Sequence, residues 1–227
     1  TQQPCYVILP RGYEKSDNVD KIPLLISLHS WSAGLEQAKP VLEKQAEKLG
    51  WIYVFPPFRG PNQTPAACGS ELAQQDILDA VAWAKQNYRV DHSRVYLTGA
   101  SGGGHMTMLM VSRHPKIWTA ASAWVGISDL TQWYTVHEKS RYGDMMRKSC
   151  GGAPGDSAIV DAQYRQRSPL PFLKNSKLVP LDIAAGIHDG HTGSVPISHS
   201  LLAFNEIAKA TGDRLITANE MKQLSIP

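Results

Sequence analysis

The chain alternates between two kinds of hydrophobic pattern. Short apolar runs bounded by Gly, Pro or polar residues predict buried strands, whereas apolar residues that recur every three or four positions predict helices. The predicted strands cover residues 5–9, 22–29, 51–55, 94–98, 119–125 and 178–185. The predicted helices cover residues 35–49, 70–87, 195–210 and 218–222, and another begins near residue 105. This alternation predicts a three-layer α/β fold, with a mostly parallel sheet and helices on both faces.

The predicted helix that follows the Pro- and Gly-rich loop of residues 56–69 has a defined start. Ser70 is a good N-cap residue, and the helix should run to about Asn87. Its apolar side should consist of Leu72, Ile77, Leu78, Val81 and Trp83.

Residues 128–174 show no sustained strand pattern. They hold mixed charges and several aromatic residues, including Trp133, Tyr134, Tyr142 and Tyr164. We interpret this segment as a lid-like insertion into a single domain that spans residues 1–227. Its aromatic rings could stack on sugar or aryl groups of a substrate, and packing within the insertion explains them equally well.

Composition narrows the class of protein. A length of 227 residues, with 42% apolar and 19% charged residues, suits one globular α/β domain. The net charge is only +3 and no cluster of Lys and Arg occurs, so we expect no nucleic-acid partner. No apolar run approaches the about 20 residues of a membrane span, so we expect no membrane association.

Three cysteines leave two alternatives open. Cys68 and Cys150 each lie beside glycines in loop-like sequence, where a disulfide bond is geometrically easy, while Cys5 opens an apolar strand. A Cys68–Cys150 bridge and three free thiols are both compatible with the sequence.

The strongest chemical signal is Gly-Ala-Ser-Gly-Gly at residues 99–103, between a predicted strand and a predicted helix. A Gly-x-Ser-x-Gly motif in that context is typical of a nucleophile elbow, in which a tight, strained turn exposes the serine. We therefore predict that Ser101 is the nucleophile of a serine hydrolase. A phosphate-binding loop would need a Lys here, and a dinucleotide fingerprint would need a small residue at Thr107, so we expect no cofactor.

A serine nucleophile requires two donors for the oxyanion, and in a parallel sheet these donors lie at the carboxyl ends of strands. One should be the backbone amide of Gly102, directly after the nucleophile. The other should come from the loop after the strand at 22–29, where we choose the Trp31 amide. His29 in the same loop is expected to brace it.

The orienting carboxylate should follow a later strand, in the chain order Ser, acid, His. Asp189, just past the strand at 178–185, fits this order, although an Asp before Gly190 could also serve only a turn. Asp129 is the second choice, and Asp182 lies within a strand and is less able to reach.

The catalytic base does not follow from the same pattern. It should come after a further helix and strand, but residues 211–227 contain no histidine. His188 and His191 flank the acid in one loop, and His199 lies in the next predicted helix, so none is well placed. We expect the base, and the last strand of the sheet, to lie beyond Pro227. The spacing of these histidines also predicts no metal site.

Four segments together carry a family resemblance: Leu28–Trp31, Phe58–Pro61, Asp91–Gly103 and Ile187–Ser200. They resemble the prolyl-oligopeptidase-like branch of the α/β hydrolases, in particular its secreted acetylxylan and feruloyl esterases, over residues 5–210. The resemblance implies an α/β-hydrolase fold, a serine esterase acting on acyl groups of plant polysaccharides, and a secreted or periplasmic location. This chain departs from the family in having His29-Ser30 where His-Gly is more usual, and in lacking the C-terminal Gly-His.

Two other functions remain open at this point. The same branch includes serine peptidases, although those commonly carry an additional propeller domain for which this chain has no room. A hydrolase-like domain that binds without catalysis is the third hypothesis. The strain expected at Ser101 argues against it, because a binding module has no use for a strained serine.

Overall fold

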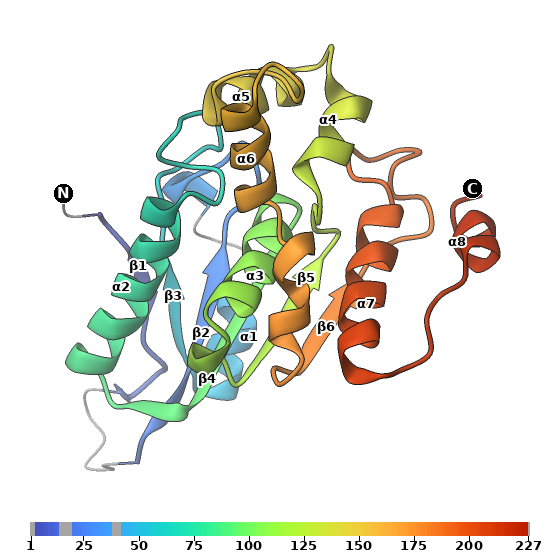
Figure 1. Ribbon diagram of the computed structural model, residues 1–227. Helices are drawn as coiled ribbons and strands as arrows, with labels where there is room; N and C mark the ends of the chain where they lie inside the picture. Colours follow the sequence, from blue (N-terminus) through green and yellow to red (C-terminus); the bar gives the residue numbers. More distant parts are fainter. Residues whose placement is uncertain (1–2, 14–19, 38–41, 227) are drawn as a thin grey trace.

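The computed structural model describes residues 3–13, 20–37 and 42–226, which form a sheet with helices on both faces (Figure 1). The strands are β1 (Tyr6–Ile8), β2 (Ile22–Leu28), β3 (Ile52–Phe55), β4 (Val90–Ala100), β5 (Ala120–Trp124) and β6 (Leu181–Ala184). Their order across the sheet is β1-β3-β2-β4-β5-β6, and β1 alone is antiparallel to its neighbour. The predicted mostly parallel α/β sheet is confirmed.

Alternate residues of β3 show how the layers form. Ile52 and Val54 belong to the main core, beneath α2 (Glu71–Asn87) and α3 (Gly102–Arg113). Tyr53 and Phe55 point to the opposite face and pack with α1 (Leu42–Leu49). Because side chains of a strand alternate between faces, both faces of this strand are buried. The 3-10 helix η4 (Leu170–Ser176) and α7 (Ser198–Thr211) lie on the α3 side (Figure 1).

The expected apolar side of α2 is wrong at two positions. Leu72 and Trp83 are 52% and 42% exposed. The buried side of the helix consists of Ala73, Ile77, Ala80, Val81 and Ala84. At about 100° per residue, Leu72 and Trp83 lie on the opposite side of the helix from Ile77 and Val81, so the helical period itself directs them outward. The N-cap is as predicted, since the Ser70 hydroxyl accepts from the Ala73 amide.

Two other predicted helices have different bounds. The helix expected over residues 35–49 is a 3-10 turn, η2 (Leu35–Gln37), followed by α1, and residues 38–41 between them lie outside the described residues. The helix expected from residue 195 begins at Ser198, because Val195 and Pro196 belong to the preceding loop. The short predicted helix near the end is α8 (Ala218–Leu224).

The segment over residues 128–174 is helical. It forms α4 (Leu130–His137), α5 (Arg141–Cys150) and α6 (Ala158–Arg167), which lie beyond the end of the sheet where β4 turns into α3 (Figure 1). A second apolar cluster joins these helices to the loops at that end. Its buried members are Trp31, Cys68, Ile127, Leu130, Trp133, Tyr134, Met145, Met146, Cys150, Val160, Tyr164 and Val195.

The cysteines of the structure are free thiols. Cys68 and Cys150 are buried and hydrogen-bond to each other, and that bond together with the charge of Arg167 lowers the pKa of the Cys68 thiol. Of the two alternatives from the sequence, a disulfide bond and free thiols, the structure has free thiols, with Cys68 and Cys150 in contact. None of the described helices is both long and apolar enough to cross a membrane.

Candidate active site

Ser101 occupies the turn between β4 and α3 with φ 57° and ψ −117°. These angles are unfavourable for a residue with a Cβ, so the strain predicted at this serine is confirmed. The Ser101 amide donates to the Trp124 carbonyl at the end of β5 (2.9 Å), which fixes the turn to the neighbouring strand. The side chain is half-buried and lies at the start of α3, where unpaired helix amides favour negative charge.

The glycines around Ser101 are required by close backbone approaches. A Cβ on Gly99 would lie 2.5 Å from the carbonyl carbon of Gly103, and one on Gly103 would lie 2.4 Å from the Leu28 carbonyl oxygen. Neither backbone can move without disturbing a central strand. This crowding is the physical reason for the small residues two positions before and after the serine.

The structure brings Gly102 and Trp31 together. A Cβ on Gly102 would lie 2.3 Å from the backbone nitrogen of Trp31, so the two predicted oxyanion donors are adjacent. Within the part of the chain that the structure describes, neither amide donates to a protein acceptor. The Trp31 carbonyl is held from behind by the Asn62 amide (2.9 Å), and its indole packs edge-on against His105.

His29 contacts the loop and not the nucleophile. Its Nε2 donates to the Pro57 carbonyl (2.7 Å), and its ring stacks on Phe58 with the ring centroids 3.8 Å apart. Burial lowers the pKa of this imidazole, and its Nδ1 lies 2.9 Å from the Ser30 carbonyl. These contacts are those of a bracing residue, as the sequence analysis expected.

Asp189 lies in the loop after β6, at the same end of the parallel sheet as Ser101. Its Oδ2 accepts from the Gly186 amide (2.7 Å), and its own amide donates back to the Gly186 carbonyl (3.1 Å). The side chain is half-buried, whereas most of the surrounding loop is exposed. We call residues 186–196 the acid loop.

The other two carboxylates have structural partners. Asp129 caps α4, where its Oδ1 accepts from the amides of Thr131 (2.8 Å) and Gln132 (3.2 Å). Asp182 accepts from the Ser122 hydroxyl on β5 (2.7 Å). Asp189 also accepts from a backbone amide, so these contacts do not choose between the three carboxylates, and Asp189 stays our prediction because it follows a strand of the sheet in the expected chain order.

The histidines near the end of the chain also have other partners. His191 Nε2 donates to the Ser225 carbonyl (2.8 Å), and His188 is exposed. Buried His199 accepts at Nδ1 from the amides of Ser128 and Asp129. Among the described residues, none forms a hydrogen bond with the Ser101 hydroxyl, and none gathers with others into a group that could hold a metal ion.

Two buried imidazoles stay neutral in this part of the molecule. Burial lowers the pKa of His105, on α3, to about 4, and the pKa of His199 to about 4 as well. His105 donates from Nε2 to the Arg167 carbonyl (2.8 Å). Both are part of the packing behind the elbow.

The acid loop is attached to the insertion by contacts that no sequence motif marks. The Ser194 carbonyl accepts from Trp133 Nε1 (2.7 Å) and from His137 Nε2 (2.6 Å), both on α4. From the sequence, Trp133 was expected only to pack within the insertion or to stack on a substrate ring. Partners separated by 61 and 57 residues leave no local pattern that could have revealed them.

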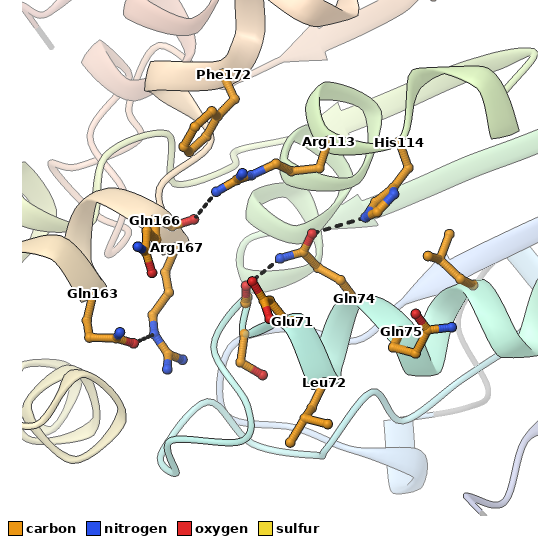
Figure 2. A pocket seen from close by; sticks show the side chains of 13 residues that line it. Glu71, Leu72, Gln74, Gln75, Arg113, His114, Gln163, Gln166, Arg167 and Phe172 are labelled. Carbon is orange, nitrogen blue, oxygen red and sulfur yellow. Dashed lines mark hydrogen bonds between the residues drawn. The ribbon is translucent and has the colours of Figure 1, made fainter.

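A cavity of about 940 Å³ lies elsewhere, between α2, the end of α3, α6 and η4 (Figure 2). Several of its polar side chains are paired with each other or with backbone. Gln163 accepts from Arg167, Gln74 from His114, and the Gln166 carbonyl from Arg113. Ser101, Asp189 and Trp31 do not line it, so it is not the candidate active site.

The parallel sheet, its covering helices and the strand–Ser101–helix turn define the chain as an α/β hydrolase. Residues 70–223, more than half of the chain, match the prolyl oligopeptidase family. The chain belongs to that family.

Its relatives include esterases and peptidases. It is 27% identical over 201 residues to acetylxylan esterase A of Emericella nidulans, covering 84% of this chain and 57% of that protein. Among solved structures, acetyl xylan esterase from Paenibacillus sp. R4 matches with a TM-score of 0.70 and 15% identity, over 90% of this chain and 69% of that one. Pyrococcus horikoshii acylaminoacyl peptidase matches with a TM-score of 0.68 and 20% identity, over 93% and 33%. The chain thus spans little more than half the length of that curated relative.

Proposed function

We propose that this protein is a serine esterase that hydrolyses carboxylic esters, with acyl groups on polysaccharides as the substrate class. The observation that carries the proposal is the elbow: a strained Ser101 whose neighbour Gly102 lies against the backbone nitrogen of Trp31. The likeness to acetylxylan esterase A supports the choice of ester and of carbohydrate.

In this mechanism the Ser101 hydroxyl attacks the acyl carbon and gives its proton to a base. The carbonyl oxygen becomes an oxyanion, which accepts from the Gly102 and Trp31 amides. The tetrahedral adduct then expels the alcohol, which takes the proton from the base, and leaves the acyl group on Ser101. Water repeats these steps and releases the acid. Asp189 orients the base and stabilises its positive charge.

Peptide hydrolysis is the second candidate, favoured by membership of the prolyl oligopeptidase family. Both reactions use the same elbow and oxyanion donors, so the substrate decides between them. A series of aryl and sugar acetates set against matched amides and short peptides separates the two. A turnover ratio in favour of amides would replace the esterase proposal.

The direct test of the nucleophile uses the complete natural protein, a fluorophosphonate probe and p-nitrophenyl acetate. Ser101→Ala should abolish labelling and reduce turnover by at least about 10³-fold, because the attacking oxygen is lost. Ser93→Ala is a matched control, since Ser93 is an exposed serine of the same strand, hydrogen-bonded to Asp91. Equal labelling of wild type and Ser101→Ala would disprove the assignment, and a wild type that neither labels nor turns over would support a non-catalytic domain.

A further inference from the structure

One backbone oxygen of the acid loop, the carbonyl oxygen of Ser194, accepts hydrogen bonds from two side chains. The Ser194 carbonyl accepts from Trp133 Nε1 at 2.7 Å and from His137 Nε2 at 2.6 Å. A third residue of the insertion, Tyr142, hydrogen-bonds to the Ser194 side chain. The loop is otherwise mostly exposed, apart from Val195, whose side chain is buried in the apolar cluster of the insertion, so the hydrogen bonds and this one apolar residue attach the loop to those helices.

The tautomer of His137 follows from its partners. A carbonyl oxygen can only accept, so Nε2 carries the hydrogen. Nδ1 lies 3.3 Å from the Ser140 hydroxyl, which also accepts from the Tyr142 amide. The hydroxyl can therefore give its hydrogen to Nδ1, and the imidazole is fully paired in its neutral form.

Ser194 is rigidly linked to Asp189 through the closed shape of the loop. The Ile197 amide donates to the Asp189 carbonyl (3.2 Å). Gly190 has φ +90°, and a Cβ there would lie 2.6 Å from the Cα of Pro196, so the backbone next to Asp189 is in contact with the end of the loop. A displacement of Ser194 is thus transmitted to the backbone that carries the candidate acid.

Trp133 also reaches the other half of the site. Its ring packs edge-on against Trp31, with the ring centroids 4.6 Å apart, and both indoles are almost completely buried. Trp31 supplies the second oxyanion amide in the proposed mechanism. The Trp133 side chain of α4 therefore contacts both Trp31, in the loop after β2, and the acid loop.

The two helices that present these donors are locked together. A Cβ on Gly143 would lie 2.4 Å from the His137 carbonyl oxygen and 2.6 Å from that of Glu138, so α5 packs directly on the end of α4. His137 and Tyr142 are in edge-on contact at 5.2 Å. The close packing of α4 and α5 therefore holds the side chains that donate to Ser194 in place.

We propose that Trp133 and His137 are positioning residues that set Asp189 relative to the oxyanion amide of Trp31. The α4–α5 pair is then a structural part of the active site. The catalytic meaning of this inference rests on the proposed function, whereas the positioning of the loop does not.

The test combines hydrogen exchange, measured by mass spectrometry, with ester kinetics on the complete natural protein. Trp133→Phe and His137→Leu each remove one donor to Ser194, and His137→Gln retains an N–H in about the same place. Trp83→Phe is the control, because Trp83 is a partly exposed tryptophan of α2. Peptides covering residues 186–197 report on the acid loop, and those covering 99–110 report on the elbow.

We expect amide exchange in the acid loop to be about 10-fold faster in Trp133→Phe and His137→Leu, the loss expected for one hydrogen bond, with the elbow unchanged. Turnover number should fall about 10- to 100-fold with KM within about twofold, because the acid is displaced while ester binding is not. His137→Gln and Trp83→Phe should resemble wild type in both measurements.

Three results would overturn the proposal. Unchanged exchange in the acid loop would show that the contacts do not hold it. Equal acceleration in loop and elbow would show general destabilisation, and faster loop exchange with an unchanged turnover number would show that catalysis does not need the attachment. A wild-type protein without turnover would refute the proposed function only. The exchange measurements would still show whether Trp133 and His137 hold the acid loop in place.

Discussion

The elbow and the acid loop supply the two halves of the candidate site, yet they are held in opposite ways. At the elbow, residues 102–104 are buried and their backbone is in contact with the backbone of neighbouring strands. The acid loop is mostly exposed and is held by hydrogen bonds from α4, by its own turn and by the buried side chain of Val195. Close contacts between backbone segments therefore fix the position of the nucleophile. The position of the candidate acid depends on contacts made by individual side chains.

This contrast predicts different responses to mutation. Changes at the elbow should disturb folding and activity together, because the same backbone contacts serve both. Changes at the exposed positions of the acid loop should affect activity with little effect on stability, because Val195 is the one residue of the loop in a buried apolar cluster.

Asp189→Asn should reduce kcat/KM for p-nitrophenyl acetate by about 10⁴-fold, because an amide cannot hold the base in the required tautomer. The midpoint of urea unfolding should change little, since the amide oxygen can still accept from Gly186. Asp129→Asn is the matched control, because Asn caps a helix as well as Asp does. If Asp129→Asn loses activity and Asp189→Asn does not, the acid is Asp129.

Gly102→Ala should reduce kcat/KM by about 10²- to 10³-fold, the loss typical of one oxyanion donor, because the new Cβ would push the Trp31 amide away. The same change should lower the free energy of unfolding by about 1–3 kcal/mol through overpacking. Gly212→Ala, at the left-handed end of α7 with nothing within 4 Å, should cost about 1 kcal/mol and leave activity unchanged. Equal activity losses in both variants would refute the close approach at the elbow.

Acidification should destabilise the packing behind the elbow. The folded protein holds the pKa of His105 and His199 at about 4, below the ordinary value of 6.5, so the unfolded chain binds protons first as the pH falls. Stability contributed by each neutral imidazole is complete above pH 6.5 and decreases down to about pH 4, with about 2 kcal/mol lost per residue by pH 5.

Urea unfolding at pH 7 and pH 5 measures this loss. His105→Gln removes one titrating group while an amide can still donate to Arg167, so its stability should fall less between the two pH values than that of wild type. The carboxylates titrate alike in both proteins and cancel in the comparison. An identical loss in the variant would contradict a neutral buried His105.

Prediction from sequence was accurate where the constraint is local. The strand, the small residues and Ser101 are consecutive, and each is needed by the same turn, so the motif specified the backbone strain. It was less accurate at the apolar side of α2. At about 100° per residue Leu72 and Trp83 lie on the opposite side of the helix from Ile77 and Val81, so this error came from the reading of the local period.

The sequence by itself determined the α/β alternation, the elbow and the order of Ser101 before Asp189, because hydrophobic periodicity and turn chemistry act over a few residues. Only the tertiary structure showed that Asp129 is a helix cap, that Cys68 contacts Cys150 and that Ser194 accepts from Trp133 and His137. These contacts join residues far apart in the chain. Their formation depends on how the insertion packs on the loops at the end of the sheet, which no local pattern encodes.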